Sequence, residues 1–291
     1  MLRRLVPILL VALATAAETP RVVILGDSIA YDGRWTTRVE SALRANPAYA
    51  EATILNLALP SETASGLSEP GHAGGVFPRP CVHDRLAEVL KQTKPTLVIA
   101  CYGMNDGVYE PFNDANFAAY KRGMERLVAA VRASGARIIF LTPPLHAPDK
   151  TRTSAQDYDN VLEAYSGWLN SKAAVGWEVV DIRPALRNAI ADEKSRNPTF
   201  RYAADNVHPG DLGHQAIAEA ALAGLWPLLK LSDKPDVGSA ARLKAVGEAQ
   251  QVLKLAWLRQ TGHKRPGIPK GVPVEAAEKQ AAEALNRAKT A

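Results

Sequence analysis

The sequence predicts an α/β fold in which a five-stranded parallel sheet is covered by helices on both faces. Three observations predict it. Short apolar runs rich in Val and Ile recur along the chain, amphipathic stretches separate them, and the 291 residues are 47% hydrophobic and 22% charged, as in ordinary globular proteins. Near-continuous apolar strands separated by helices are typical of parallel sheets buried on both faces. We therefore expect a flavodoxin-like three-layer α/β/α sandwich.

The predicted strands and helices alternate in chain order. The apolar runs RVVILG, ATILNL, TLVIAC, RIIFLT and WEVVDI predict strands at residues 21–26, 52–57, 96–101, 137–142 and 177–182. The amphipathic stretches predict helices at residues 34–45, 83–93, 116–134, 155–172 and 212–226. Since ligands of such sheets bind beyond the carboxyl ends of the strands, the loops that follow the strands are the expected place for a site.

The first 17 residues have the pattern of an export signal. Arg3 and Arg4 precede an apolar run over residues 5–13, and the small residues ATAA follow it. The apolar run is too short to span a bilayer stably. A lipid anchor is not expected, because there is no Cys near the predicted cleavage site. We expect residues 1–17 to be a signal peptide and the protein to be exported to the periplasm or the extracellular space. An uncleaved anchor is the alternative.

The character of the chain changes near residue 231. A linker-like stretch leads into a predicted helix over residues 239–260, and a Gly- and Pro-rich segment separates this from a last polar helix ending near Lys289. We therefore divide the chain into a domain of residues 18–230 and a helical extension of residues 231–291. We expect the domain to be active on a small soluble ester without the extension.

The extension carries the positive charge of the protein. Residues 231–291 hold 11 Lys and Arg against 6 Asp and Glu, an excess equal to the net charge of +5 of the whole chain. A nucleic-acid partner is not expected, because the extension has a single aromatic residue, Trp257, and no known binding module. Leu243, Val246 and Leu253 have helical spacing, so one face of this helix docks either on the domain or on a partner or an anionic cell-envelope surface.

Three polar blocks fall at the same edge of the predicted sheet. The block GDS ends in Ser28 just after the first strand, YGMNDG places Asn105 after the third strand, and ADNVHPGDLGH places Asp205 and His208 before the last helix of the domain. A hydroxyl needs an adjacent base to become a nucleophile, and the base needs a partner that fixes its tautomer. Asn105 offers an amide donor to an oxyanion. Each block alone is ordinary turn chemistry, but their joint occurrence indicates a catalytic site.

These motifs resemble those of the SGNH/GDSL-type serine hydrolases over about residues 20–230. The matching segments are GDSI, GMND and DNVHP. The resemblance implies the flavodoxin-like fold, Ser28 as nucleophile, His208 as general base and Asp205 as the residue that orients it. It also implies an oxyanion hole formed by the Ser28 backbone N–H, the Asn105 side chain and a backbone N–H of the second block. It implies neither a cofactor nor a metal.

The second block departs from the family pattern. In the segment NLALPSETASGL, the position at which the family has Gly falls on Ser61. The oxyanion hole needs only the backbone N–H of this position. Ser61 can therefore serve as the donor if the loop tolerates a Cβ. Gly66 is the alternative. The Gly-x-Ser-x-Gly elbow of the α/β-hydrolases is absent, which argues against that other fold.

The remaining polar and aromatic residues have structural interpretations beside functional ones. Four of the other His residues show no ligand-like spacing, so no metal site is expected, and His214 is expected to pack at the start of its helix. Cys81 and Cys101 could form one disulfide, although a buried thiol is the favoured interpretation for Cys101. Aromatic residues near the three blocks could form a platform for a sugar ring or pack in the core; they are Tyr31, Trp35, Tyr102 and Tyr109. The long loop over residues 68–80 is a candidate substrate-shaping loop.

We therefore expect an exported serine esterase that acts on small-molecule or glycan esters through an acyl-enzyme, with O-deacetylation of a carbohydrate as the favoured reaction. Two alternatives remain open at this stage. One is a lysophospholipase- or thioesterase-type activity at the same site. The other is a non-catalytic glycan-binding protein, which would have no need of Ser28, Asn105, Asp205 and His208 together.

Overall fold

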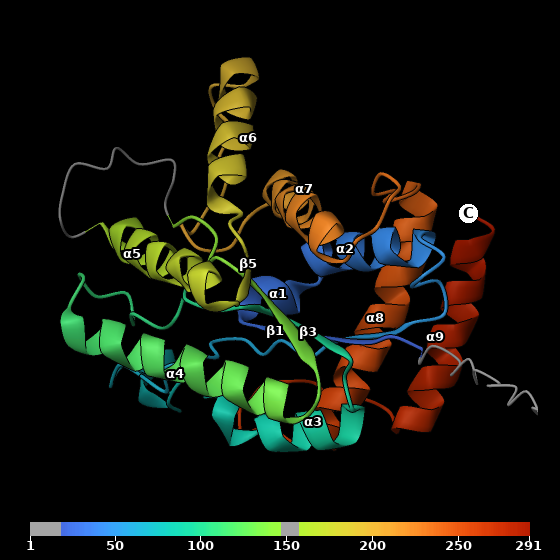
Figure 1. Ribbon diagram of the computed structural model, residues 1–291, viewed down its shortest axis with the longest axis horizontal. Helices are drawn as coiled ribbons and strands as arrows, with labels where there is room; N and C mark the ends of the chain where they lie inside the picture. The colour runs from blue at the N-terminus through green and yellow to red at the C-terminus, as the bar shows by residue number, and fades with distance from the viewer. Residues whose placement is uncertain (1–18, 147–156) are drawn as a thin grey trace, which may run out of the picture.

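The computed structural model describes residues 19–146 and 157–291, and it has the predicted α/β architecture (Figure 1). The predicted signal peptide, residues 1–17, lies outside the described residues, and so do the first two residues of the helix predicted at 155–172. The sheet has five strands, all parallel, in the order β2-β1-β3-β4-β5. The flavodoxin-like fold predicted from the sequence is confirmed.

The strands lie inside the ranges that the apolar runs predict. They are β1 (Arg21–Gly26), β2 (Thr53–Asn56), β3 (Leu97–Cys101), β4 (Arg137–Leu141) and β5 (Glu178–Val180). The chain leaves β1 toward β2 on one side and then returns across β1 to β3, so the direction of winding reverses between β1 and β3. Gly26 and Cys101 are paired at the carboxyl ends of these two strands. Ligands of doubly wound sheets bind at this switch point.

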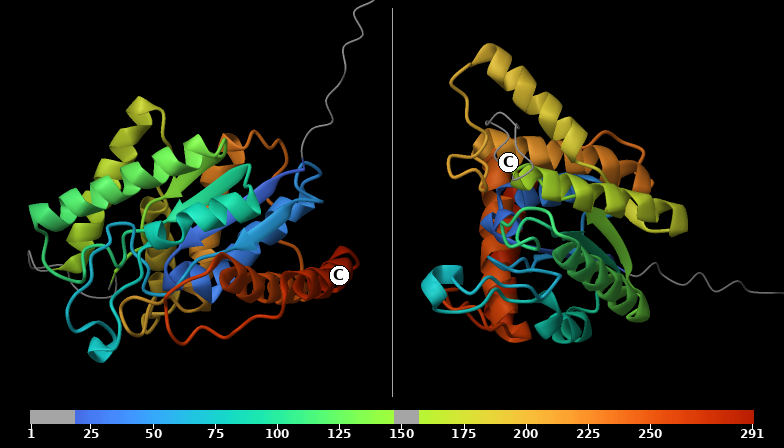
Figure 2. Two further views of the ribbon diagram at one scale, coloured as in Figure 1. Left: turned by 90° about the horizontal axis from the view of Figure 1, so that it is seen from below. Right: turned by 90° about the vertical axis from the view of Figure 1, so that its left-hand side faces the viewer.

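Helices cover the two faces of the sheet as right-handed crossovers require. On one face, α2 (Arg34–Ala45) packs against α7 (Asp211–Leu228). The opposite face carries α3 (Leu86–Thr93), α4 (Asp114–Ala133) and α5 (Tyr158–Ser171), as the views in Figures 1 and 2 show. The rings of Tyr120 and Tyr165, whose centroids are 4.2 Å apart, join α4 to α5.

Two helical segments differ from the prediction. The helix predicted at residues 83–93 is interrupted at Arg85, between a short 3-10 turn, η2 (Val82–Asp84), and α3, because the Arg85 guanidinium turns inward to a buried ion pair with Glu62. The helix α6 (Arg183–Arg196) was not predicted and projects away from the sheet in Figure 1. Its side chains are mostly polar, so it lacks the apolar periodicity from which the other helices were predicted. Two further 3-10 turns are η1 (His72–Gly75) and η3 (Lys172–Val175).

The C-terminal extension forms two helices that pack together, α8 (Ala240–Thr261) and α9 (Val274–Lys289). The helix α8 contacts the edge strand β2 and also α2 and α3, which cover opposite faces of the sheet, so it crosses the β2 edge (Figures 1 and 2). Docking on the domain, one of the two predicted alternatives, is therefore observed for this helix. In the described part of the chain, no helix combines the length and apolar character needed to cross a membrane.

Candidate active site

The end of β1 brings Ser28 to the carboxyl edge of the sheet. A Cβ at Gly26 would lie 2.9 Å from the Cys101 carbonyl oxygen, so only glycine allows β1 and β3 to approach this closely at their ends. The Asp27 carboxylate then accepts a hydrogen bond of 2.9 Å from the Ile29 N–H and caps α1 (Ser28–Asp32). Ser28 is the first residue of this helix, where backbone N–H groups have no partner within the helix.

Ser28, His208 and Asp205 form one continuous hydrogen-bonded chain. The His208 Nε2 atom lies 2.8 Å from the Ser28 Oγ atom, and the His208 Nδ1 atom lies 2.7 Å from an Asp205 carboxylate oxygen. The second carboxylate oxygen of Asp205 accepts the backbone N–H groups of Val207 and His208 at 3.0 and 2.8 Å. The turn that carries Asp205 and His208 therefore meets Ser28, at the start of α1, in the geometry of a catalytic triad.

The electrostatics of Asp205 suit the role of the orienting carboxylate. Burial alone would raise the pKa of Asp205, but hydrogen bonds from the His208 ring and from the N–H groups of His208 and Val207 lower it to about 2. The group is therefore ionised near neutral pH, where a carboxylate stabilises the imidazolium that forms when the base takes a proton.

The loop after β2 brings Ser61 next to this site. The Leu59 N–H donates to the Gly26 carbonyl oxygen at 2.9 Å, which places the loop beside the end of β1. Ser61 has a φ of +65°, in the left-handed region that glycine prefers, which accounts for Gly being usual at this position. Within the described residues, no hydrogen bond occupies the Ser61 N–H. The predicted donor is therefore free to bind an oxyanion.

Asn105 lies against the same loop. Its Nδ2 group donates to the Glu62 carbonyl oxygen at 3.2 Å, one residue after Ser61, and its side chain is buried. Gly66, the alternative donor, also has a positive φ, of +76°, but the contact of Asn105 is with the loop around Ser61. The geometry therefore favours Ser61 over Gly66 as the second backbone donor.

Asp106 fixes the course of the loop that carries these donors. One of its carboxylate oxygens accepts the N–H groups of Ala64 and Ser65 at 2.8 and 2.7 Å. Burial raises the pKa of Asp106 to about 6, although these N–H groups lower it. On the other side of the loop, a Cβ at Gly123 would lie 2.1 Å from the Ala64 carbonyl oxygen, so α4 supports the loop at backbone contact.

Comparison with known proteins agrees with this geometry. A model of the GDSL-like lipase/acylhydrolase family matches residues 24–216, about two thirds of the chain. The chain belongs to this family. It is an SGNH ester hydrolase, and the family resemblance of its motifs is confirmed. The match ends before α8, so both helices of the C-terminal extension lie outside it.

Solved structures share the fold of this GDSL hydrolase at low sequence identity. A catalytic mutant of Axe2, an acetylxylan esterase from Geobacillus stearothermophilus, aligns with a TM-score of 0.55 and 18% identity over 71% of this chain and 94% of that one. LAE5, an α/β hydrolase enzyme from the metagenome of Lake Arreo in Spain, aligns with a TM-score of 0.52 and 20% identity over 70% and 94%. A search of curated protein sequences found no significant match.

Several residues that support the site of this hydrolase were missed from the sequence. Glu62 is fully buried and binds the Arg85 guanidinium and the Tyr102 hydroxyl, each at 2.7 Å. Arg79 reaches the Asn105 side chain from the loop over residues 68–80. The only signal that could have indicated Arg79 is its position as the one charged residue of the segment GGVFPRP.

The other aromatic, His and Cys residues considered in the sequence mostly have structural positions. Trp35 and Tyr102 are buried in the core, and Tyr31 is half-buried, so Tyr109, 37% exposed, is the candidate of the four for a platform. His214 packs at the start of α7 as predicted, and burial lowers its pKa to about 4. Cys81 and Cys101 are free thiols. The described residues hold no cluster of three or more metal-ligating side chains.

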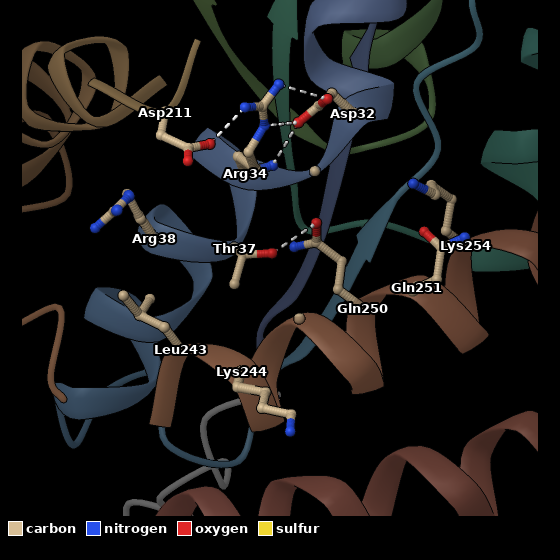
Figure 3. Close-up of a pocket in the computed structure, with 12 residues that line it drawn as sticks. Asp32, Arg34, Thr37, Arg38, Asp211, Leu243, Lys244, Gln250, Gln251 and Lys254 are labelled. Carbon is tan, nitrogen blue, oxygen red and sulfur yellow. Dashed lines mark hydrogen bonds and ion pairs between the residues drawn. The ribbon is translucent and has the colours of Figure 1, made fainter. Parts of the chain in front are cut away.

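A polar cavity of about 340 Å³ lies beside the active site, between α2 and α8. Figure 3 shows Arg34 at its upper end, bound to Asp32 at the end of α1 and to Asp211 at the start of α7. Arg34 also donates to the Pro209 carbonyl oxygen, directly after His208, at 3.3 Å. Arg34 in the wall of this cavity therefore connects α1, which begins with Ser28, to the turn that carries His208.

Proposed function

We propose that the protein removes O-acetyl groups from a carbohydrate through an acyl-enzyme and that it acts after export. The observation that carries this proposal is the openness of the site. The side chains of His208 and Asp205 are 50% and 58% exposed, so a bulky alcohol such as a sugar can approach the nucleophile. Tyr109 adds an exposed aromatic face, a group that commonly packs against apolar ligand surfaces.

The geometry supports a two-step mechanism. His208 Nε2 accepts the Ser28 hydroxyl proton as the Oγ atom attacks the acetyl carbonyl carbon, and Asp205 stabilises the resulting imidazolium. The Ser28 and Ser61 backbone N–H groups and Asn105 Nδ2 stabilise the oxyanion. As the tetrahedral intermediate collapses and the ester C–O bond breaks, the imidazolium gives its proton to the departing sugar oxygen, which leaves as a hydroxyl. Water, activated by His208, then hydrolyses the acetyl-serine and releases acetate.

Two further observations support the substrate class and the location. Solved structures with the same fold include enzymes described as acetylxylan and acetyl-xylooligosaccharide esterases, and residues 1–17 have the sequence pattern of an export signal. We expect fractionation of cells that express the full chain to place it outside the cytoplasm. Retention in the cytoplasm would contradict the export proposal. Contact of the basic extension with the cell envelope stays a prediction.

The first experiment is labelling with an organophosphonate. We expect one equivalent of probe to bind to Ser28, as located by mass spectrometry of the peptide, and no label in Ser28→Ala. This variant should fold normally and hydrolyse 4-nitrophenyl acetate about a thousandfold or more slowly. A protein that resists the probe and hydrolyses no ester would support the glycan-binding alternative.

A second experiment compares substrates. Acetylated xylooligosaccharides, 4-nitrophenyl esters of two to twelve acyl carbons and a lysophospholipid are hydrolysed under identical conditions. We expect the highest kcat/KM with acetyl esters and a steep fall with acyl length. A preference for long acyl chains or for the lysophospholipid would contradict deacetylation while leaving the serine mechanism intact.

A further inference from the structure

The amide of Asn105 is held from its oxygen side by two residues. Arg79 Nη1 donates to Asn105 Oδ1 at 2.9 Å, and the Tyr109 hydroxyl donates to the same oxygen at 3.2 Å. A guanidinium has donors and no acceptor, so Arg79 can bind only the oxygen end of the amide. The nitrogen end therefore faces away from Arg79, and one of its two N–H groups binds the Glu62 carbonyl oxygen. Among the residues that the structure describes, the other N–H has no partner, so it can bind a ligand.

We propose that Arg79 and Tyr109 are positioning residues of the oxyanion hole, which keep Asn105 Nδ2 directed at the developing oxyanion. The inference rests on the role proposed above for Asn105. Without these two contacts only the Glu62 carbonyl oxygen would hold the amide, at 3.2 Å from Nδ2. A rotation by half a turn would then direct the amide oxygen at the oxyanion, where it would repel the negative charge. The contacts also polarise the amide, which strengthens the N–H as a donor.

Arg79 is itself rigidly placed. Its guanidinium binds both carboxylate oxygens of Glu69, at 2.7 and 2.6 Å, and its side chain is only 6% exposed. Its backbone N–H donates to the Ser68 hydroxyl at 2.9 Å. Both partners lie at the start of the loop over residues 68–80, and Arg79 lies near its end. These contacts join the two ends of the loop. They hold the Arg79 guanidinium next to Asn105 and pair its charge with that of Glu69.

Tyr109 reaches Asn105 through a strained turn. Val108 and Tyr109 have φ values of +49° and +59°, in the left-handed region that β-branched and bulky residues avoid. The ring of Tyr109 packs 4.8 Å from that of Tyr158, and the Arg79 guanidinium lies 5.3 Å from its centroid. Strained backbone of this kind persists where the surrounding contacts enforce it, often at functional sites. Here the turn directs the hydroxyl back to Asn105.

A double-mutant cycle tests the inference. Arg79→Gln should lower kcat for 4-nitrophenyl acetate by about 10- to 100-fold with KM changed by less than about threefold, because an oxyanion donor acts on the transition state. In the Asn105→Ala background the same substitution should lower kcat by less than about threefold, since the group it positions is gone. Tyr109→Phe should behave in the same way with a smaller loss, about three- to tenfold.

Two matched controls separate positioning from general stability. Arg137→Gln breaks another Arg–Glu pair, with Glu178, at the opposite end of the sheet, and Tyr165→Phe removes a buried hydroxyl that has no hydrogen-bond partner in the described structure. Both should leave kcat within about twofold, whatever they do to the melting temperature.

Three outcomes would overturn the inference. Additive losses in kcat across the cycle would show that Arg79 and Tyr109 act independently of Asn105. A rise in KM with unchanged kcat would make them substrate-binding residues instead. An unchanged kcat in Asn105→Ala alone would overturn the oxyanion role itself and the inference with it. If Arg79→Gln does not fold, the Tyr109→Phe cycle decides by the same criteria.

Discussion

Two buried carboxyl groups close to Ser28 show how single residues shape this candidate site. Asp27 caps the helix that begins with Ser28, and Asp106 holds the loop after Ser61. Burial raises the pKa of Asp27 to about 7, with a smaller contribution from the charge of Asp106. The local structure therefore depends on carboxyl groups whose charged forms are costly to bury.

Asp27→Asn should change how stability depends on pH. The carboxyl of an unfolded Asp titrates near pH ~3.9, whereas in the folded protein the pKa of Asp27 is about 7. Between these values the folded state holds a proton that the unfolded state has lost, so the stability of the wild type falls as the pH rises through this window. Asn keeps the capping oxygen and cannot ionise. We expect the variant to gain on the order of 2 kcal/mol relative to wild type between pH 5 and pH 8.

Urea unfolding at the two pH values measures this difference. Asp192→Asn, at an exposed position of α6, is the control and should show no comparable pH dependence. A difference between Asp27→Asn and wild type that stays constant from pH 5 to pH 8 would show that Asp27 is ionised in the folded protein throughout this range.

Ser61→Gly tests the other residue that departs from the family pattern. The left-handed φ of Ser61 is unfavourable for a residue with a Cβ and open to glycine. Because only the backbone N–H is required there, we expect kcat/KM for 4-nitrophenyl acetate within about tenfold of wild type and a change in unfolding free energy below about 1 kcal/mol. A loss of about a hundredfold or more, the size expected when an oxyanion donor is removed, would mean that the Ser61 hydroxyl takes part in the reaction.

At the scale of elements, α8 supports the helices that carry the site. Gln250 on α8 is buried, and its Oε1 atom accepts the Thr36 hydroxyl at 2.6 Å and the Asn56 amide at 3.3 Å. Its Nε2 group donates to the buried carboxylate of Glu40 at 2.7 Å. One turn further along, Lys254 Nζ donates to the Tyr31 carbonyl oxygen at 2.5 Å, near the end of the helix of the nucleophile. The extension thus adds hydrogen bonds to buried polar groups of the domain, and among the described residues only Gln250 donates to the Glu40 Oε2 atom.

Gln250→Ala should destabilise the protein by about 2 to 4 kcal/mol, because it removes several buried hydrogen bonds at once and leaves the Glu40 Oε2 atom without its donor. Its neighbour offers a matched control. Gln251 is exposed and, like Gln250, lines the cavity between α2 and α8 (Figure 3). Gln251→Ala should change the unfolding free energy by less than about 0.5 kcal/mol. Chemical denaturation of both variants makes the comparison. Equal changes in unfolding free energy for the two variants would show that the polar contacts of Gln250 do not stabilise the packing of α8 on the domain.

At the scale of the whole molecule, the extension and the domain share one core. Apolar residues of both C-terminal helices belong to the same buried cluster as the strands; they include Ala249, Leu253, Leu258, Ala277 and Ala281. The division at residue 230 was drawn from a change in composition, and the packing across it is continuous. The structure therefore argues against the expectation that the domain works unaided.

Removal of residues 232–291 should prevent the domain from folding stably. The truncation uncovers the edge strand β2, which could then pair with other chains, and it exposes apolar surface that α8 covers. We expect the truncated chain to be aggregated or to lack a cooperative thermal transition, as measured by size-exclusion chromatography and circular dichroism. A monomeric product that melts cooperatively and hydrolyses 4-nitrophenyl acetate within tenfold of the full chain would restore the two-part division.

The sequence by itself determined the fold class and predicted which residues the structure brings together as Ser28, His208 and Asp205. Apolar runs of strand length fix which segments are buried. Ser28 and Asn105 stand in short motifs after two of those strands, and Asp205 and His208 stand in a third motif before the last helix of the domain, so local pattern is enough to find them. Only the tertiary structure decided how the site is supported. Arg79 meets Asn105 across 26 residues, and Gln250 meets Thr36 across 214. Periodicity records which face of an element is buried, but the pairing of polar groups between distant segments depends on how those elements pack, which no local pattern encodes.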